Sequence, residues 1–334
     1  MSRERAREAC GRPDCPRNRD CNGTRRLTPR GRWRMVTSSA VDPSPAGDPL
    51  RSTADTAEVR TMRHLSALAA PVLAIMIATP VAAGSPSTVY VALGDSLAWG
   101  DGASDPASTS YTALLSDYFP GEPHGGAKQY LNLAVRGETT TSYLAGGQAA
   151  AAIAAISDPT TDTRIVTLSL GGNDLLDLLN EPTDPCVVNP ASATCQGLVA
   201  SAMGTVAANY PAIMASLGDA LLGDPGAEKV FVLTLYNPFG GTSSGFEGVV
   251  DVGLLGADLT IDCTALSNPM NIGLNDLVAC ISGALGAIVI DGYTVVGDNA
   301  LALTHIGDPG FNIHPNDDGY AAIAKAHRGA DRGR

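Results

Sequence analysis

The feature that most constrains the fold is an alternation of short apolar segments with longer segments of helical periodicity. Strands are predicted for five apolar segments, at 88–93, 129–135, 164–170, 229–235 and 287–296. Helical patterns lie between or after them, at 109–119, 140–157, 173–179, 197–222 and 315–327. Strands that alternate with helices predict parallel βαβ units with helices on both faces of one sheet, so the predicted class is α/β.

Two irregular regions interrupt this alternation. Residues 181–196 are rich in turn-forming residues and contain two cysteines that could hold a loop in place. Residues 236–264 are rich in Gly, Ser and Asp, and the segment is longer than an ordinary connection. Because connections of this length are usually functional or disordered, we expect 236–264 to form one wall of a substrate cleft.

The first 61 residues differ in composition from the rest of the chain. They are rich in arginine and show no sustained apolar period. We expect residues 1–61 to be a disordered or non-native extension, with native translation starting at Met62. N-terminal sequencing of the secreted product checks this expectation.

Residues 62–83 have the pattern of a secretory signal peptide. A short basic start at Arg63 precedes an apolar run that ends in small residues, which predicts cleavage after Ala83. The alternative is an uncleaved membrane anchor, because the apolar run at 65–83 is close to spanning length. Prolines and alanines within the run favour cleavage. The sequence therefore predicts a secreted domain at 84–334.

The predicted mature domain is strongly acidic. Residues 84–334 carry 8 Lys and Arg against 26 Asp and Glu, a net charge of −18, compared with −12 for the whole chain. Nucleic acids and anionic membranes require a basic surface, so both are poor candidates for partners. The length suits one domain with a sizeable core, and we expect a monomer that does not insert stably into a membrane after signal cleavage.

The cysteine count agrees with export. Removal of residues 1–83 reduces an odd total of seven cysteines to an even four, and an even set in an oxidising compartment suggests disulfides. Sequence order suggests Cys186–Cys195 and Cys263–Cys280, although four cysteines allow three connectivities and buried free thiols are the alternative. None of the spacings resembles a zinc site, so no metal is expected.

Polar residues follow the predicted strands at their carboxyl ends, the edge where doubly wound sheets bind ligands. They are Asp95 and Ser96 after the first strand, Gly137 after the second, Asn173 and Asp174 after the third, and His314 in the last loop. Each has a structural alternative, since Asp, Ser and Asn are common helix caps and His314 precedes Pro315 at a helix start. Together, however, they offer a hydroxyl, a base and oxyanion donors, which is the set that acyl transfer needs.

Four short motifs occur in the order G-D-S-L (94–97), N-L-A-V-R-G (132–137), G-G-N-D (171–174) and H-P (314–315). This order resembles the SGNH, or GDSL, hydrolase superfamily, and the resemblance extends from about residue 88 to about residue 326. It implies a flavodoxin-like, three-layer α/β/α domain with a mainly parallel, doubly wound, five-stranded sheet. It also implies ester hydrolysis of the carboxylesterase or lipase type, without metal or cofactor.

The resemblance implies a role for each matching residue. Ser96 matches the nucleophile and also offers its backbone N–H to the oxyanion. Gly137 matches the second oxyanion donor through its backbone, and Asn173 matches the third through its side chain. His314 matches the general base. Lipid or carbohydrate esters, or other small-molecule esters, are the implied substrates.

One position departs from the family pattern. The family commonly has Asp three residues before the His, whereas this chain has Phe311 there. The group that orients His314 must then come from elsewhere. Asp308 is the first candidate, a backbone carbonyl of the same loop the second, and Asn312 the third. The neighbouring His305 has no assigned role, and we expect it to be structural or to line the cleft.

Two other functions fit the same residues. The same site could deacetylate carbohydrate or transfer the acyl group to another alcohol. The departure at Phe311 leaves open a non-catalytic secreted binding module.

Overall fold

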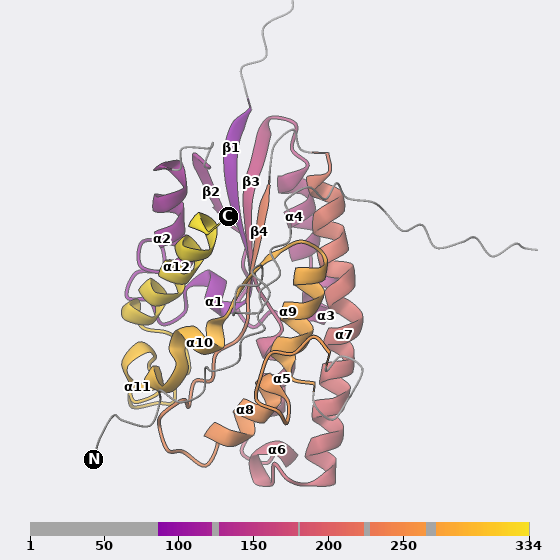
Figure 1. Ribbon diagram of the computed structural model, residues 1–334, viewed down its shortest axis with the longest axis vertical. Helices are drawn as coiled ribbons and strands as arrows, with labels where there is room; N and C mark the ends of the chain where they lie inside the picture. The colour runs from indigo at the N-terminus through magenta and orange to yellow at the C-terminus, as the bar shows by residue number, and fades with distance from the viewer. Residues whose placement is uncertain (1–85, 122–126, 180, 224–227, 265–271, 334) are drawn as a thin grey trace, which may run out of the picture. The chain divides into compact units, whose positions relative to one another are not determined.

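Five parallel strands form the central sheet of the computed structural model, in the order β2-β1-β3-β4-β5 (Figure 1). The structure describes residues 86–121, 127–179, 181–223, 228–264 and 272–333. The strands are β1 (Ser87–Gly94), β2 (Gln129–Asn132), β3 (Thr161–Ser169), β4 (Lys229–Leu233) and β5 (Ile288–Ile290). The chain runs outward from β1 to β2 and then returns past β1 to β3. This flavodoxin-like order confirms the predicted class and places a switch point between β1 and β3.

The central strands are covered on both faces, which explains why β1 and β4 are nearly continuous apolar runs, whereas the edge strand β2 is partly exposed. In β1 the side chains alternate between the two faces, as the pleat of a strand requires. Val89, Val91 and Leu93 pack into one core cluster, whereas Tyr90 and Ala92 pack into the other.

Helices cover both faces of the sheet (Figure 1). Helices α2 (Tyr111–Tyr118) and α12 (Asp317–Arg332) contribute to the cluster on one face. Helices α4 (Gln148–Ile156), α7 (Ala193–Leu221) and α9 (Leu274–Ala284) contribute to the other. The other α-helices are α1 (Ser96–Trp99), α3 (Thr140–Ala145), α5 (Gly172–Leu176), α6 (Pro185–Val188), α8 (Glu247–Leu255), α10 (Gly292–Val296) and α11 (Ala300–Leu303).

Two predicted elements are divided in the structure. The predicted strand 287–296 is a strand only at β5 and continues as α10, because the Asp291 side chain accepts hydrogen bonds from the backbone N and Oγ1 of Thr294. This helix cap outweighs the β-propensity of the residues that follow. The predicted helix 140–157 is two helices, α3 and α4. They are separated at Gly147, whose φ of +103° is a conformation that favours glycine.

The two irregular regions contain helices. The segment 236–264, expected to be a loop, includes α8, so that prediction was wrong for part of its length. The segment 181–196 contains α6 and the first turn of α7, which the Cys186–Cys195 disulfide joins. The second disulfide, Cys263–Cys280, ties the segment before α9 to that helix. Both predicted pairings are therefore present.

Helix α7 is the only described helix long and apolar enough to cross a membrane by length and composition. Its inner face, which includes Val206, Tyr210 and Leu217, is fully buried in the core. The same criteria are met by core helices of soluble proteins. The predicted extension 1–61 and the predicted signal peptide 62–83 lie outside the described residues.

Candidate active site

The turn after β1 places Ser96 at the carboxyl edge of the sheet. Gly94 ends the strand with a φ of +128°, and a Cβ there would lie 2.0 Å from the backbone oxygen of Ser169. Only glycine allows this close approach between β1 and β3. Asp95 then caps α1, since its Oδ1 accepts a hydrogen bond of 3.0 Å from the backbone N of Leu97. Ser96 is thus the first residue of a short helix that begins directly at the strand end.

Asp95 is buried, and its environment is unusual for a carboxyl group. Burial raises its pKa to about 7, opposed in part by the hydrogen bonds from Leu97 and Ser169. Its polar contacts hold the turn rather than face solvent. Asp95 therefore acts as the cap that the sequence already suggested as its structural alternative.

His314 lies against Ser96, although 218 residues separate them in the chain. The Nε2 atom of His314 is 2.9 Å from Ser96 Oγ. The loop that carries His314 is held by Tyr236, whose hydroxyl donates to the backbone oxygen of Ile313 at 2.6 Å. Burial lowers the pKa of His314 below its usual value, so the imidazole is neutral at pH 7 and can accept a proton.

Asn312 is the side chain that contacts the other ring nitrogen of His314. Its Oδ1 is 2.8 Å from His314 Nδ1 and also accepts a 3.0 Å hydrogen bond from the His314 backbone N. A backbone N–H can only donate, which identifies the Asn312 atom as the amide oxygen. Nδ1 must then carry the proton, which leaves Nε2 as the acceptor that faces Ser96 Oγ.

Asp308 does not contact His314. Its Oδ2 pairs with Nδ1 of His305 at 2.6 Å, and the other ring nitrogen of His305 is 2.7 Å from the backbone oxygen of Gly102. The first candidate for orienting His314 is therefore at a different imidazole, and the third candidate, Asn312, takes its place. The reason is local: Phe311 adopts a φ of +50°, and Asn312 turns back onto the following histidine.

The contacts of these two residues predict opposite results on substitution. Asn312→Ala lowers kcat for a short p-nitrophenyl ester by about 10- to 100-fold, because His314 loses its orienting acceptor. Asp308→Asn keeps kcat within about threefold, because its partner is His305. Steady-state kinetics of both variants decide the matter. The reverse order of the two losses would contradict the geometry.

Gly137 and Asn173 lie on adjoining segments of the same edge. Gly137 has a φ of +71° and open space around its Cα, and neither its N–H nor that of Ser96 donates to any of the described residues. The Nδ2 atom of Asn173 donates to the backbone oxygen of Glu138 at 2.9 Å, one residue after Gly137. Asn173 still has a second N–H on the same nitrogen that could serve an oxyanion.

Asp174 holds the same two segments together from the next position. Its carboxylate accepts from the backbone N of Thr140 at 2.9 Å and from its hydroxyl at 2.7 Å. The G-G-N-D motif therefore has two polar residues that tie α5 to the start of α3. The structural and chemical interpretations of this motif are compatible.

A charged group borders the site at Arg136. Its guanidinium lies 3.6 Å from the ring centroid of Trp99 and pairs with Asp101 at 2.5 Å. Both partners follow Ser96 closely in the chain. The charge of Arg136 also contributes to the lowered pKa of His314.

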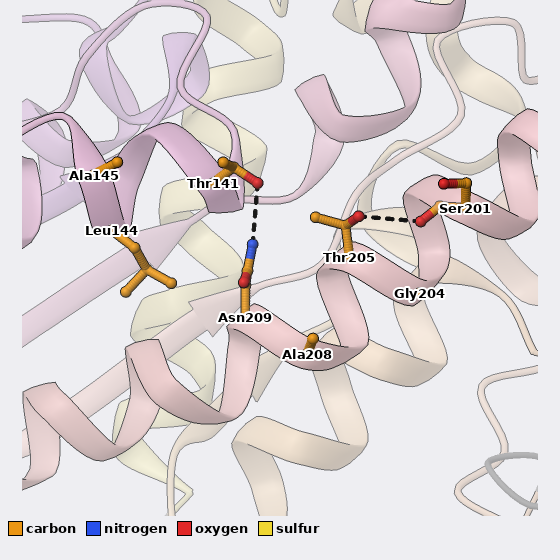
Figure 2. Close-up of a pocket in the computed structure, with 8 residues that line it drawn as sticks. All are labelled: Thr141, Leu144, Ala145, Ser201, Gly204, Thr205, Ala208 and Asn209. Atoms are coloured by element: carbon orange, nitrogen blue, oxygen red, sulfur yellow. Dashed lines mark hydrogen bonds between the residues drawn. The ribbon is translucent and has the colours of Figure 1, made fainter.

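A hollow on the described surface lies away from these residues. It has a volume of about 620 Å³ and lies between α3 and α7, where the Asn209 amide bonds to Thr141 Oγ1 (Figure 2). Leu144, Gly204 and Ala208 also line it, whereas none of Ser96, Gly137, Asn173 and His314 does. Within the described ranges, no three His, Cys, Asp or Glu side chains gather where they could hold a metal ion.

The parallel α/β sheet places the Ser96 hydroxyl against the neutral His314 imidazole at its switch-point edge, an arrangement that suits nucleophilic hydrolysis. Residues 92–322 match the family model of the GDSL-like lipase/acylhydrolase family, and the chain belongs to that family. The resemblance found in the four motifs is thereby confirmed.

Similar solved structures are lipases and esterases. An extracellular lipase from Streptomyces rimosus is 23% identical and a phospholipase A1 from Streptomyces albidoflavus is 20% identical. Both alignments cover 73% of this chain, with 100% and 99% of those chains, and both have a TM-score of 0.48. An acetylxylan esterase from Geobacillus stearothermophilus is 14% identical, with 73% of this chain and 94% of that chain covered and a TM-score of 0.45. No curated protein sequence matches the chain.

Proposed function

We propose that this chain is a secreted serine ester hydrolase that works through an acyl-enzyme on Ser96. The observation that carries the proposal is a chain of two hydrogen bonds. Ser96 Oγ lies 2.9 Å from Nε2 of His314, and Nδ1 of His314 lies 2.8 Å from Oδ1 of Asn312. The nucleophile therefore has a base within reach, and the base has an orienting group.

The reaction has two halves. Ser96 Oγ attacks the ester carbonyl while His314 Nε2 takes the hydroxyl proton, and the tetrahedral intermediate expels the alcohol, which receives that proton. A water molecule then attacks the acyl-enzyme, with His314 as base again. His314 then passes the proton taken from water to Ser96 Oγ as the carboxylic acid leaves. Asn312 Oδ1 accepts the hydrogen bond from Nδ1–H throughout and stabilises the imidazolium that forms in each half of the reaction.

Three donors serve the oxyanion in this proposal: the N–H groups of Ser96 and Gly137 and the second N–H of Asn173. Support for the two backbone donors comes from their lack of an acceptor among the described residues. Preorganised donors of this kind stabilise the charge that develops only in the transition state. The roles of all three follow those that the family resemblance implies.

The proposed location is extracellular. The two disulfides support it, because disulfides form and persist in oxidising compartments. The signal-peptide pattern at 62–83 points the same way. Export with cleavage after Ala83 would produce the acidic domain described above.

The proposal predicts saturable hydrolysis of p-nitrophenyl esters by the purified full chain, and covalent labelling by a fluorophosphonate probe. The expected stoichiometry is one label per chain, on the peptide that contains Ser96. A series of esters with two to sixteen acyl carbons separates esterase from lipase activity. An acetylated sugar tests for deacetylase activity, and product analysis with an added acceptor alcohol tests for acyl transfer. Absence of both hydrolysis and labelling would leave a binding module and overturn the proposal.

A further inference from the structure

A buried glutamine links the two loops of the proposed site. Gln148 is the first residue of α4, and only 4% of it is exposed. Its side-chain amide bonds to both backbone polar groups of Gly94, accepting from N at 2.7 Å and donating to O at 2.9 Å. At the end of β1, two residues before Ser96, the amide is the partner of the Gly94 N–H and shares the Gly94 oxygen with the backbone N of Val135.

The same amide also holds the loop that follows β2. The second N–H of Gln148 Nε2 donates to Oε2 of Glu138 at 2.7 Å, and the Ser142 hydroxyl donates to the other carboxylate oxygen. Glu138 is 4% exposed and directly follows Gly137. Each carboxylate oxygen thus has a donor, so the network is satisfied although it is buried.

These contacts converge on one backbone unit. The Glu138 backbone oxygen accepts from Asn173, while the Glu138 side chain accepts from Gln148. The Gly137–Glu138 segment is therefore held from two sides, and Gln148 alone among these residues also holds the end of β1. Two other links join the same segments: Val135 N donates to the backbone oxygen of Gly94 at 2.9 Å, and Arg136 pairs with Asp101. Gln148 is the buried side chain that adds a third link and satisfies the Gly94 N–H.

We infer that Gln148 is a positioning residue that sets the geometry between the Ser96 and Gly137 N–H groups. The inference rests on the proposed function, since those two groups are its oxyanion donors. Gln148 touches neither substrate nor reacting atoms. Its loss displaces donors that act only in the transition state, so the effect falls on kcat rather than KM.

The test compares Gln148→Met with a control on the same helix. Methionine keeps the length of the side chain but has no donor for Gly94 O and Glu138, and its sulfur is only a weak acceptor for Gly94 N. Ile156→Ala removes a buried side chain from the other end of α4 and destabilises the fold through a cavity instead. Where all proteins are folded, we expect Gln148→Met to lower kcat by about 10- to 100-fold, with KM within about threefold. Ile156→Ala should keep kcat within about twofold of the wild type.

A second pair of variants covers the case in which Gln148→Met does not fold. Glu138→Gln keeps an oxygen for the Gln148 amide, whereas Glu138→Ala removes it. We expect Glu138→Gln to restore most of the kcat that Glu138→Ala loses. Equal losses in these two variants would overturn the inference, as would a Gln148→Met kcat within twofold of Ile156→Ala.

Hydrogen exchange separates this inference from the proposed function. In Gln148→Met we expect the amides of 133–139 to exchange at least about tenfold faster than in the wild type, with no such change in Ile156→Ala. Unchanged exchange at 133–139 overturns the inference even where hydrolysis is intact. If the wild type hydrolyses no ester but exchange at 133–139 is still faster in Gln148→Met, the proposed function is overturned. The structural link that Gln148 makes between the two loops would still stand.

Discussion

Ser96→Ala lowers kcat for p-nitrophenyl butyrate by about 10⁴- to 10⁶-fold, the loss expected when a serine nucleophile is removed. The physical reason is that no other hydroxyl lies against the Nε2 atom of His314 among the described residues. Steady-state kinetics on enzyme free of wild-type contamination measure the loss. Fluorophosphonate labelling should disappear in parallel.

The fold should tolerate this change. The capping hydrogen bond at the start of α1 comes from Asp95, and Ser96 Oγ bonds only to His314 among the described residues. We expect the free energy of unfolding to change by no more than about 0.5 kcal/mol. Ser108→Ala, at an exposed serine that bonds to Asp105, serves as the control and should keep full activity. Retained turnover in pure Ser96→Ala would refute the assignment of the nucleophile.

His314→Ala lowers kcat by about 10⁴-fold or more, because the attacking hydroxyl loses the group that takes its proton. The wild-type rate also depends on the protonation state of His314, which must be neutral to act. Since burial lowers the pKa of His314, kcat/KM should be at its plateau at pH 7 and should fall as the pH decreases through a value below about 6.5. The pH–rate profiles of wild type and variant measure both effects.

His305→Ala is the matched control for the loss of an imidazole. His305 bonds to Asp308 and to the Gly102 backbone and does not contact Ser96. Its side chain steadies the neighbouring loop, so we expect a loss of no more than about tenfold in kcat. The acid limb should remain but move to slightly higher pH, because the charge of His305 contributes to the lowered pKa of His314. A larger loss in His305→Ala than in His314→Ala would show that the base is assigned to the wrong histidine.

Much of the fold could be predicted from periodicity. The run 230–235 is continuous and almost wholly apolar, which predicts a strand buried on both faces, and its residues 231–234 are buried. The end of the last strand could not be predicted in this way. There the residues after Asp291 favour a strand by composition, whereas the Asp291 side chain caps a helix. The break at Gly147 was similarly hidden, because a glycine within an alanine-rich run is compatible with one helix.

The candidate site could be predicted in outline because parallel strands end at one edge. Ser96, Gly137 and Asn173 each follow a strand, and His314 belongs to a four-motif order that resembles one family. The family match confirms that resemblance. Asn312 was only a third candidate, since no sequence pattern tells which side chain of a loop turns back onto an imidazole. Gln148 and Glu138 were missed entirely.

The sequence by itself determined the α/β class and the family, and it suggested the disulfide pairing that the structure contains. These depend on periodicity, local motifs and cysteines that lie close together in the chain. Only the tertiary structure decided which side chain contacts Nδ1 of His314 and which buried side chain links the end of β1 to Glu138. The bonds that Asn312 accepts depend on the backbone turn at Phe311, whose φ is +50°. The bonds of Gln148 depend on a buried side chain that reaches a residue 54 positions away in the chain. Such contacts leave no periodic trace in the sequence, because a glutamine at a helix start has the same local propensity whether or not a strand end lies beside it.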